Sequence, residues 1–356
     1  MWGMHVAKYE APTTDDRRIW DLWLTGLYQS AIMAADDTGV FAALGEAPAT
    51  IEALAKRMDF DVRATGVLLR LLAALGLIVS RNGQFQLTDQ ARLYLVRSSP
   101  FYWGNMMRVG VNATTVQRIV EKLKQQGSAT APGPEETPPP AVGEGGPAEG
   151  WAAGRISLEQ AHSIAAGMHS HSLPAAIGAA RNYDFAGVKR ILDVGGGSGC
   201  FMVAMAQAHP ELKCTIMELS TMCQVAQTYI DGGGVPSQVD TTAVDMFREP
   251  WPKGYDAVFF SNVWHDWNFR TCTWLARQAH AVLPTGGRIM LHEMLIDDNG
   301  SGPATAAAFS LLMLLGTQGQ QFTFDELKTI LEEARFTDIE ASTTAGHYSI
   351  TTGYKR

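Results

Sequence analysis

The feature that most constrains this chain is a glycine-rich turn between an apolar segment and an alanine-rich segment. Residues 190–194 (RILDV) are predicted to form a buried strand, and residues 195–199 (GGGSG) follow directly, before the helical run CFMVAMAQAHP. Glycine lets the backbone pass close to a ligand, and a helix that begins at the turn points its N-terminus at that ligand. This pattern predicts a nucleotide-type site at the carboxyl end of a parallel strand.

Strands and helices alternate through the rest of the C-terminal part, which favours an α/β domain with a parallel, Rossmann-like sheet. Seven strands are predicted, at 190–194, 214–218, 239–244, 256–261, 288–295, 337–342 and 347–353. No helix separates the last two, so we expect an antiparallel hairpin at the end of an otherwise parallel sheet.

Acidic residues end the strands that follow the turn. Glu218 stands about 20 positions beyond it, where a carboxylate accepts hydrogen bonds from ribose hydroxyls. Asp245, in VDMF, ends the next strand and could bind an adenine amino group. A dinucleotide fold remains the alternative, but it would place its third glycine where Cys200 stands. Asp193 would repel a pyrophosphate and suits a cationic cofactor, so we predict S-adenosylmethionine.

The N-terminal part has the pattern of a winged helix. Thr50 can cap a helix, a second helix is expected at about 62–75, and LIVSRNGQFQLT alternates about the Asn-Gly pair at 82–83. DNA binding is the alternative role, but the second helix offers only Arg63 and Arg70, and 28 basic against 36 acidic residues give a net charge of −8. The apolar opening helices favour a dimerisation role instead.

A glycine- and proline-rich segment separates these parts. Twelve of the 24 residues at 127–150 are glycine or proline, which predicts a linker. The expected domains are therefore 1–126, helical and winged-helix; 127–155, linker; and 156–356, catalytic. The sequence contains no long apolar run or signal-peptide core, and its four cysteines form no CxxC pair, so we expect a cytoplasmic protein without a membrane partner.

The fourth predicted strand leads into Ser261-Asn262-Val263-Trp264-His265-Asp266-Trp267, and Glu293 lies on the next strand, in LHEML. Neighbouring parallel strands end at the same edge of a sheet, so the two side chains can meet there. A carboxylate that fixes one imidazole nitrogen leaves the other as a general base. His265 and Glu293 are therefore the predicted catalytic pair.

The chain resembles the S-adenosylmethionine-dependent O-methyltransferases of the plant caffeate and bacterial antibiotic-tailoring type. The motifs LDVGGGSG, VDMF, HDW, LPTGGRIMLHEMLIDD and FTFDELKTILEEARF occur in the family's order, and the resemblance covers nearly the whole chain. It implies a class I methyltransferase domain behind a winged-helix dimerisation domain, a homodimer, and a small-molecule acceptor without nucleic acid. The cofactor residues it implies are Asp193, Gly195, Gly197, Glu218, Leu219, Asp245, Met246, Phe247 and Ser261.

The resemblance also implies that His265 is the base and that Glu293 orients it. Gln321 is the third catalytic residue that it implies. Gln321 stands where the family often has a second glutamate; an amide can hydrogen-bond but cannot stabilise an imidazolium by charge. Ser261 stands where the plant enzymes often have lysine. The expected acceptor pocket is lined by Met168, Trp264, Phe309 and Met313.

The expected reaction is methyl transfer to a hydroxyl of a small, aromatic or polyketide-like specialised metabolite. Transfer to carbon or nitrogen, non-methylation chemistry around the cofactor, and a cofactor-binding DNA regulator are the alternatives. No metal is expected, because His169 and His171 do not share a face of their predicted helix and Gln318, Gln320 and Gln321 stand where metal-binding relatives supply a histidine.

Overall fold

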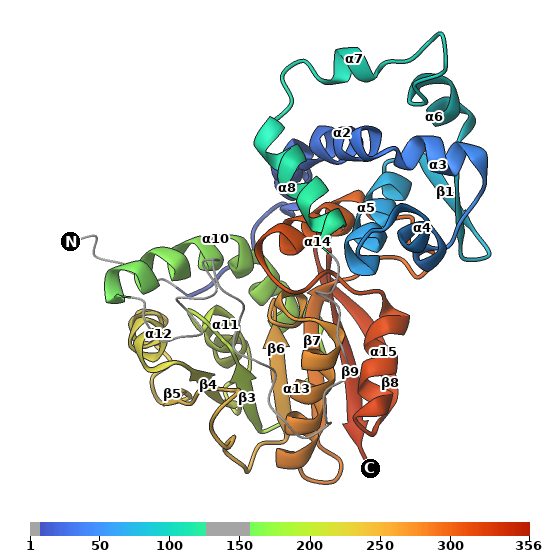
Figure 1. Ribbon diagram of the computed structural model, residues 1–356. Coiled ribbons are helices and arrows are strands. Elements are labelled where there is room, and N and C mark those ends of the chain that lie inside the picture. Colours follow the sequence, from blue (N-terminus) through green and yellow to red (C-terminus); the bar gives the residue numbers. More distant parts are fainter. Residues whose placement is uncertain (1–7, 126–156) are drawn as a thin grey trace. The chain divides into compact units, whose positions relative to one another are not determined.

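The computed structural model describes residues 8–125 and 157–356 (Figure 1), and the predicted linker at 127–155 therefore lies outside the described residues. The described residues form two compact units. One, the catalytic unit, comprises 8–16, 157–294 and 326–356. The other, the helical unit, comprises 17–125 and 295–325.

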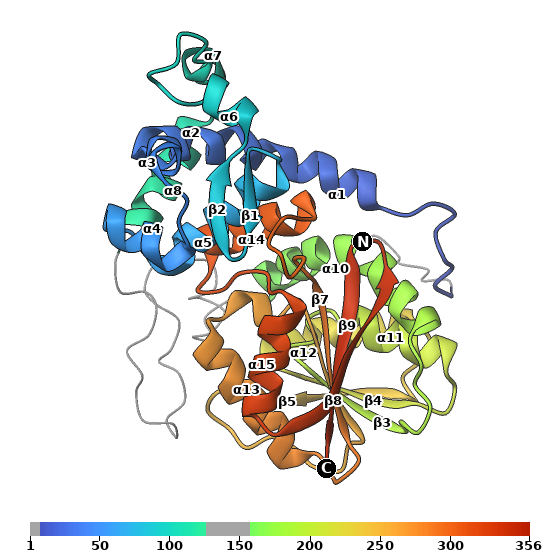
Figure 2. The same cartoon turned by 90° about the vertical axis from the view of Figure 1, so that its right-hand side faces the viewer.

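A seven-stranded sheet forms the centre of the catalytic unit, in the order β5-β4-β3-β6-β7-β9-β8 (Figure 2). The strands from β5 to β7 are parallel, and β9 is antiparallel to both β7 and β8. The predicted mostly parallel sheet with a terminal antiparallel hairpin is thereby confirmed. The bounds are β3 Arg190–Val194, β4 Lys213–Glu218, β5 Val239–Ala243, β6 Ala257–Ser261, β7 Arg288–Met294, β8 Phe336–Ala345 and β9 Tyr348–Lys355.

Helices cover both faces of this sheet. Figure 2 shows α13 and α15 on one side and α10 and α11 on the other. The bounds are α10 Leu158–Asn182, α11 Cys200–Ala208, α12 Ser220–Gly232, α13 Phe269–Val282 and α15 Phe324–Glu333, with a short 3-10 helix, η2, at Trp264–Asp266. Because the strand order reverses beside β3, the crevice of this sheet lies between the carboxyl ends of β3 and β6.

The helical unit contains the predicted winged helix, formed by α4, α5, β1 and β2. Thr50 caps α4 by accepting a hydrogen bond from the Ala53 N–H. Asn82 and Gly83 have φ values of 51° and 76°, as a two-residue hairpin turn requires, so the predicted Asn-Gly turn is confirmed. The bounds are α1 Arg17–Leu24, η1 Thr25–Leu27, α2 Tyr28–Thr38, α3 Val40–Glu46, α4 Ile51–Met58, α5 Val62–Ala74, β1 Ile78–Arg81, β2 Gln84–Leu87, α6 Asp89–Tyr94, α7 Gly104–Met107, α8 Ala113–Lys124 and α14 Ala304–Gly316.

Helix α14 belongs to the helical unit although it follows the glycine-rich turn by a hundred residues. It is apolar on every side and packs against α1, α5 and α8. The predicted domain boundaries place residues 295–325 in the catalytic domain, whereas the structure places these residues in the compact helical unit. None of the helices within 8–125 and 157–356 combines the length and the apolar character that crossing a membrane requires.

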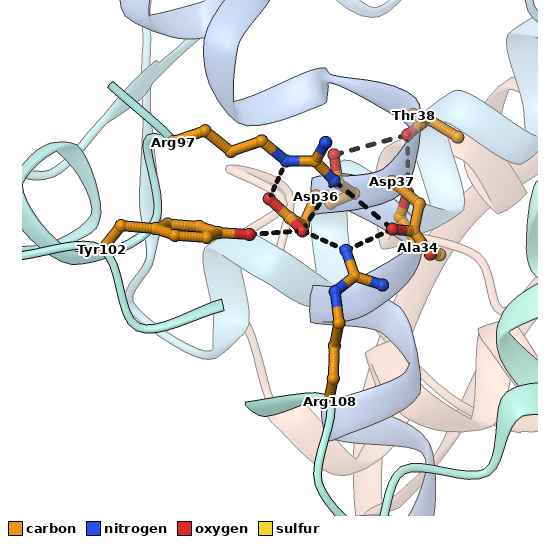
Figure 3. A network of polar contacts seen from close by, with 8 residues as sticks. Ala34, Asp36, Asp37, Thr38, Arg97, Tyr102 and Arg108 are labelled. Carbon is orange, nitrogen blue, oxygen red and sulfur yellow. Dashed lines mark hydrogen bonds and ion pairs between the residues drawn. The ribbon is translucent and has the colours of Figure 1, made fainter. Parts of the chain in front are cut away.

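A buried carboxylate ties α2 to the segment 97–108 of the helical unit (Figure 3). Asp36, whose side chain is only 5% exposed, accepts two hydrogen bonds from Arg97 at 3.0 and 3.1 Å and one from the Tyr102 hydroxyl at 2.7 Å. Arg108 donates to both Asp36 and Asp37. Burial raises the pKa of Asp36, but the two arginines and the tyrosine outweigh burial and hold that pKa below its usual value.

We expect Asp36→Asn to lower the free energy of unfolding by about 2 kcal/mol, because the amide leaves two guanidinium groups without their buried counter-charge. Asp37→Asn is the matched control and should cost less than half as much, since the Asp37 side chain is 33% exposed. Denaturant unfolding of the three proteins measures both values. Equal losses for the two variants would contradict the role assigned to Asp36.

Candidate functional site

The turn between β3 and α11 has the backbone that its glycines permit. Gly195, Gly197 and Gly199 have φ values of 72°, 56° and 74°, in the left-handed region that side chains rarely adopt. A Cβ on Gly196 would lie 2.4 Å from Asp193 Oδ2. The turn therefore passes directly over the Asp193 carboxylate, and Gly199 caps the N-terminus of α11.

Two buried carboxyl groups flank this turn. Glu218, the last residue of β4, accepts hydrogen bonds from the Leu219 N–H at 2.8 Å and the Gly197 N–H at 3.3 Å. Asp193 is 1% exposed, and its Oδ2 has no hydrogen-bond partner among the described residues. Burial raises the pKa of Glu218 to about 7, while burial and the nearby Glu218 raise the pKa of Asp193 well above its usual value.

This arrangement fits the predicted cofactor. No arginine or lysine of residues 8–125 and 157–356 forms an ion pair with Asp193 or Glu218. A ligand that brings positive charge and hydroxyl donors would restore the interactions that these buried groups lack. S-adenosylmethionine carries a sulfonium, an ammonium group and ribose hydroxyls.

The loop after β5 places Asp245, Met246 and Phe247 at the same edge of the sheet. Asp245 shapes this loop by accepting a hydrogen bond from the Phe247 N–H at 2.9 Å. The Met246 carbonyl accepts one from the Trp251 indole at 2.8 Å, and the Phe247 ring meets Trp267 edge-on at 4.7 Å. Since the Val244 N–H bonds the Glu218 carbonyl at 2.9 Å, the loop starts beside the carboxylate at the end of β4.

The predicted pair of His265 and Glu293 meets in the structure. His265 Nδ1 lies 2.8 Å from Glu293 Oε2, and both side chains are buried. Glu293 Oε1 accepts the N–H groups of Val263 and Trp264 at 3.2 and 3.1 Å, so the carboxylate holds the whole turn that carries the histidine. Burial lowers the pKa of His265, but Glu293 and then Asp266 raise it, and the net result is a pKa above the usual value.

Two histidines near this pair were not predicted to belong to the site. His171, on α10, interacts electrostatically with His265, and burial together with that neighbour lowers the pKa of His171 to about 4. His292 precedes Glu293 on β7 and lies 3.0 Å from the Ser261 hydroxyl. The pairing of Ser261 with His292 in the β6–β7 register would have indicated this contact, but that register is not visible in the sequence.

The other predicted site residues fall into two groups. In the catalytic unit, Met168 is 52% exposed on α10, whereas Trp264 is fully buried and packs edge-on against Phe260 at 5.7 Å. Phe309, Met313 and Gln321 belong to the helical unit, where the Gln321 N–H donates to Ser310 Oγ at 3.1 Å. Their place beside His265 stays a prediction.

His169, excluded above as a metal ligand, has other partners in the structure. His169 Nδ1 lies 3.0 Å from the Ser198 hydroxyl in the glycine-rich turn, and its ring stacks on Tyr229 at 4.5 Å. No group of three or more metal-ligand side chains occurs within the described ranges. His169 therefore joins α10 to the glycine-rich turn.

Two family models match the chain. That of an O-methyltransferase domain matches residues 140–337, and that of an O-methyltransferase dimerisation domain matches residues 20–97. The 3-hydroxy-5-methyl-1-naphthoate 3-O-methyltransferase of Streptomyces sahachiroi is 32% identical over 321 residues, which cover 88% of each chain.

Solved structures agree with this result. An O-methyltransferase family 2 protein of Planctomyces limnophilus, in complex with apigenin, has a TM-score of 0.83 and 26% identity over 99% of both chains. Human N-acetylserotonin methyltransferase in complex with SAM has a TM-score of 0.56 and 21% identity, covering 97% of this chain and 99% of that one, and thus shares the fold.

We expect cofactor affinity to fall by up to about tenfold between about pH 8 and about pH 6, because protonation of Glu218 would remove the charge that is predicted to receive the ribose hydroxyls. A carboxyl whose pKa is near 7 is ionised above that pH and neutral below it, so the affinity rises with pH. Calorimetric titration with S-adenosylhomocysteine measures the change. Glu218→Gln should bind more weakly, and its affinity should change less with pH than that of the unaltered protein; a flat profile in the unaltered protein would contradict the assignment.

Proposed function

We propose that this chain, which belongs to the S-adenosylmethionine-dependent O-methyltransferase family, methylates a hydroxyl of a small aromatic or polyketide-like metabolite with His265 as general base. The relative from Streptomyces sahachiroi acts on a hydroxynaphthoate, and the Planctomyces protein was solved with apigenin. Both molecules carry hydroxyl groups on flat aromatic rings, which supports an acceptor of this chemical class.

The buried pair of His265 and Glu293 is the observation that carries the proposal. Because Glu293 Oε2 accepts the Nδ1 proton at 2.8 Å, the other ring nitrogen, Nε2, is the one that can take a proton. The raised pKa of His265 brings the imidazole closer in basicity to a phenol, whose pKa is about 10. His265 would thus accept the hydroxyl proton as the oxygen becomes a nucleophile.

S-adenosylmethionine supplies the methyl group when it is bound. On the side of the chain, Asp193, Glu218 and the turn at 195–199 would hold the cofactor at the carboxyl ends of β3 and β4. His265 follows the neighbouring strand β6, so that a hydroxyl beside it would face the same edge. Holding two reactants in this way can contribute roughly 7–11 kcal/mol to the lowering of the barrier.

Apolar side chains would complete the acceptor site. Met168, on α10, is the proposed lining within the catalytic unit, and Phe309, Met313 and Gln321 of the helical unit remain predicted members of the acceptor site. An apolar lining with few polar groups suits a flat aromatic acceptor. The buried position of Trp264 favours a role in supporting the turn.

A role in DNA binding receives no support from the winged helix. Arg63, one of the two arginines of α5, donates to the Gly319 carbonyl at 2.7 Å within the helical unit. Burial lowers the pKa of Arg63, and its guanidinium is committed to this internal contact. A phosphate-binding residue needs an accessible charge instead.

The helical unit is proposed to pair two copies of the chain. On α1, Ile19, Leu22 and Trp23 are 67%, 51% and 57% exposed, while Trp20 and Leu24 are buried. An exposed apolar stripe on the helix that opens the region matched by the dimerisation model suits a second copy.

For catalysis, we expect His265→Ala to lower the rate of methyl transfer by about 10²–10⁴-fold, the contribution of a general base. The measurement uses labelled cofactor and mass spectrometry of a panel of aromatic hydroxyl compounds. His162→Ala is the control, since His162 is exposed on α10 and should leave the rate unchanged.

The Glu293→Gln variant tests whether His265 acts as a base or has only a structural role. Without the carboxylate, the pKa of His265 falls, so the acidic limb of the pH–rate profile should move to lower pH. Full activity of His265→Ala on its true acceptor would refute the base assignment.

For assembly, we expect the double substitution Ile19→Asp, Leu22→Asp to raise the dissociation constant of the dimer by more than about tenfold, because it places charge in an apolar interface. Light scattering coupled to size-exclusion chromatography measures the oligomeric state. Leu158→Asp, at an exposed leucine of the catalytic unit, is the matched control. A variant that stays dimeric would exclude α1 from the interface.

A further inference from the structure

The mechanism leaves one buried histidine without a role. His292 lies on β7 directly before Glu293, and successive side chains of a strand point to opposite faces of the sheet. Its ring is fully buried, stacks on Tyr348 at 4.8 Å with 5° between the planes, and meets the Phe201 edge at 4.9 Å. The orientation of this imidazole is therefore fixed by aromatic packing.

The hydrogen bonds of His292 determine which of its nitrogens carries the proton. The Thr344 hydroxyl donates to the Tyr348 carbonyl at 3.2 Å, and a hydroxyl has only one hydrogen to give. At His292 Nε2, 3.2 Å away, the Thr344 oxygen must accept, so Nε2 carries the proton. Burial lowers the pKa of His292 to about 3, and the neutral ring leaves Nδ1 as an acceptor.

The acceptor at Nδ1 in turn determines what Ser261 can offer. The Ser261 hydroxyl lies 3.0 Å from Nδ1 and must donate its single hydrogen there. Its oxygen keeps two lone pairs and is therefore a pure acceptor towards any further partner. Ser261 is half-buried and ends β6, the strand beside β3 at the switch point of the sheet.

We propose that His292 is a positioning residue that fixes the Ser261 hydroxyl as an acceptor for an N–H of the α-ammonium group of S-adenosylmethionine. This inference rests on the cofactor site of the proposed function. The carboxylate of the cofactor has no hydrogen to give. Its ribose hydroxyls are predicted at Glu218, at the end of β4, and its adenine amino group is expected at the loop after β5, whereas Ser261 follows β6, on the far side of β4 and β3.

The test compares two ligands by calorimetry: S-adenosylhomocysteine, and its analogue in which hydrogen replaces the α-amino group. Ser261→Ala and His292→Phe should each weaken S-adenosylhomocysteine binding by about tenfold or more, as the loss of a hydrogen bond to a charged group does, and leave the analogue's affinity unchanged. Compared with His292→Phe, His292→Asn should restore most of the affinity, because the asparagine amide oxygen can lie close to the position that Nδ1 occupies.

Nitrogen-15 spectra of histidine-labelled protein provide a readout that is independent of ligand binding. His292 should show a protonated Nε2 and a bare Nδ1 and should not titrate between about pH 5 and about pH 9. Its signal is assigned by its loss in His292→Phe. His209, whose Nε2 lies 2.7 Å from the Ala180 carbonyl, is an internal reference for a protonated Nε2.

The possible outcomes separate the inference from the proposed function. A protonated Nδ1 on His292, or an equal loss of affinity for both ligands in Ser261→Ala, overturns the inference while the function stands. Should His292→Phe fail to fold, Ser261→Ala and Ser261→Cys still decide between these results. An unaltered protein that binds no S-adenosylhomocysteine refutes the proposed function as well.

Discussion

The carboxylate of Glu293 receives three hydrogen bonds from three consecutive residues of the neighbouring segment, Val263, Trp264 and His265. Two come from backbone N–H groups and one from the imidazole, and all lie between 2.8 and 3.2 Å. A buried anion needs such compensation, because an unsatisfied charge in the interior is very costly. The same bonds that make the burial of Glu293 tolerable hold the turn after β6 in one shape. The position of His265 therefore follows from the solvation of its partner.

Strand β7 serves two sites because its side chains alternate between the faces of the sheet. Glu293 reaches the turn that carries His265, and His292, one residue earlier, reaches Ser261 on the other face. The register that pairs Ser261 with His292 thus fixes both contacts at once. A slip of one residue would exchange the two side chains, and each face would lose its partner. Register is consequently the property of this sheet on which both contacts depend.

Local patterns in the sequence were sufficient to predict much of this architecture. The strands, the Asn-Gly hairpin and the turn at 195–199 each depend on residues close together in the chain. The contact between His265 and Glu293 could also be predicted, because neighbouring parallel strands end at the same edge of the sheet. The tautomer of His292 could not be predicted, since it depends on Thr344, some fifty residues away, and on the antiparallel pairing of β9 with β7. The Asp36 network likewise joins residues more than sixty positions apart.

The insertion of β9 between β7 and β8 has a consequence for how this protein is made. During synthesis, β3 to β7 leave the ribosome before the segment 336–355 that supplies Thr344 and Tyr348. Until then, β7 is an edge strand of the sheet. His292 lacks Tyr348, on which its ring stacks, and the Thr344 hydroxyl, which determines that Nε2 carries the proton. The hydrogen-bond chain from Thr344 through His292 to Ser261 is completed only by the last strands to be translated.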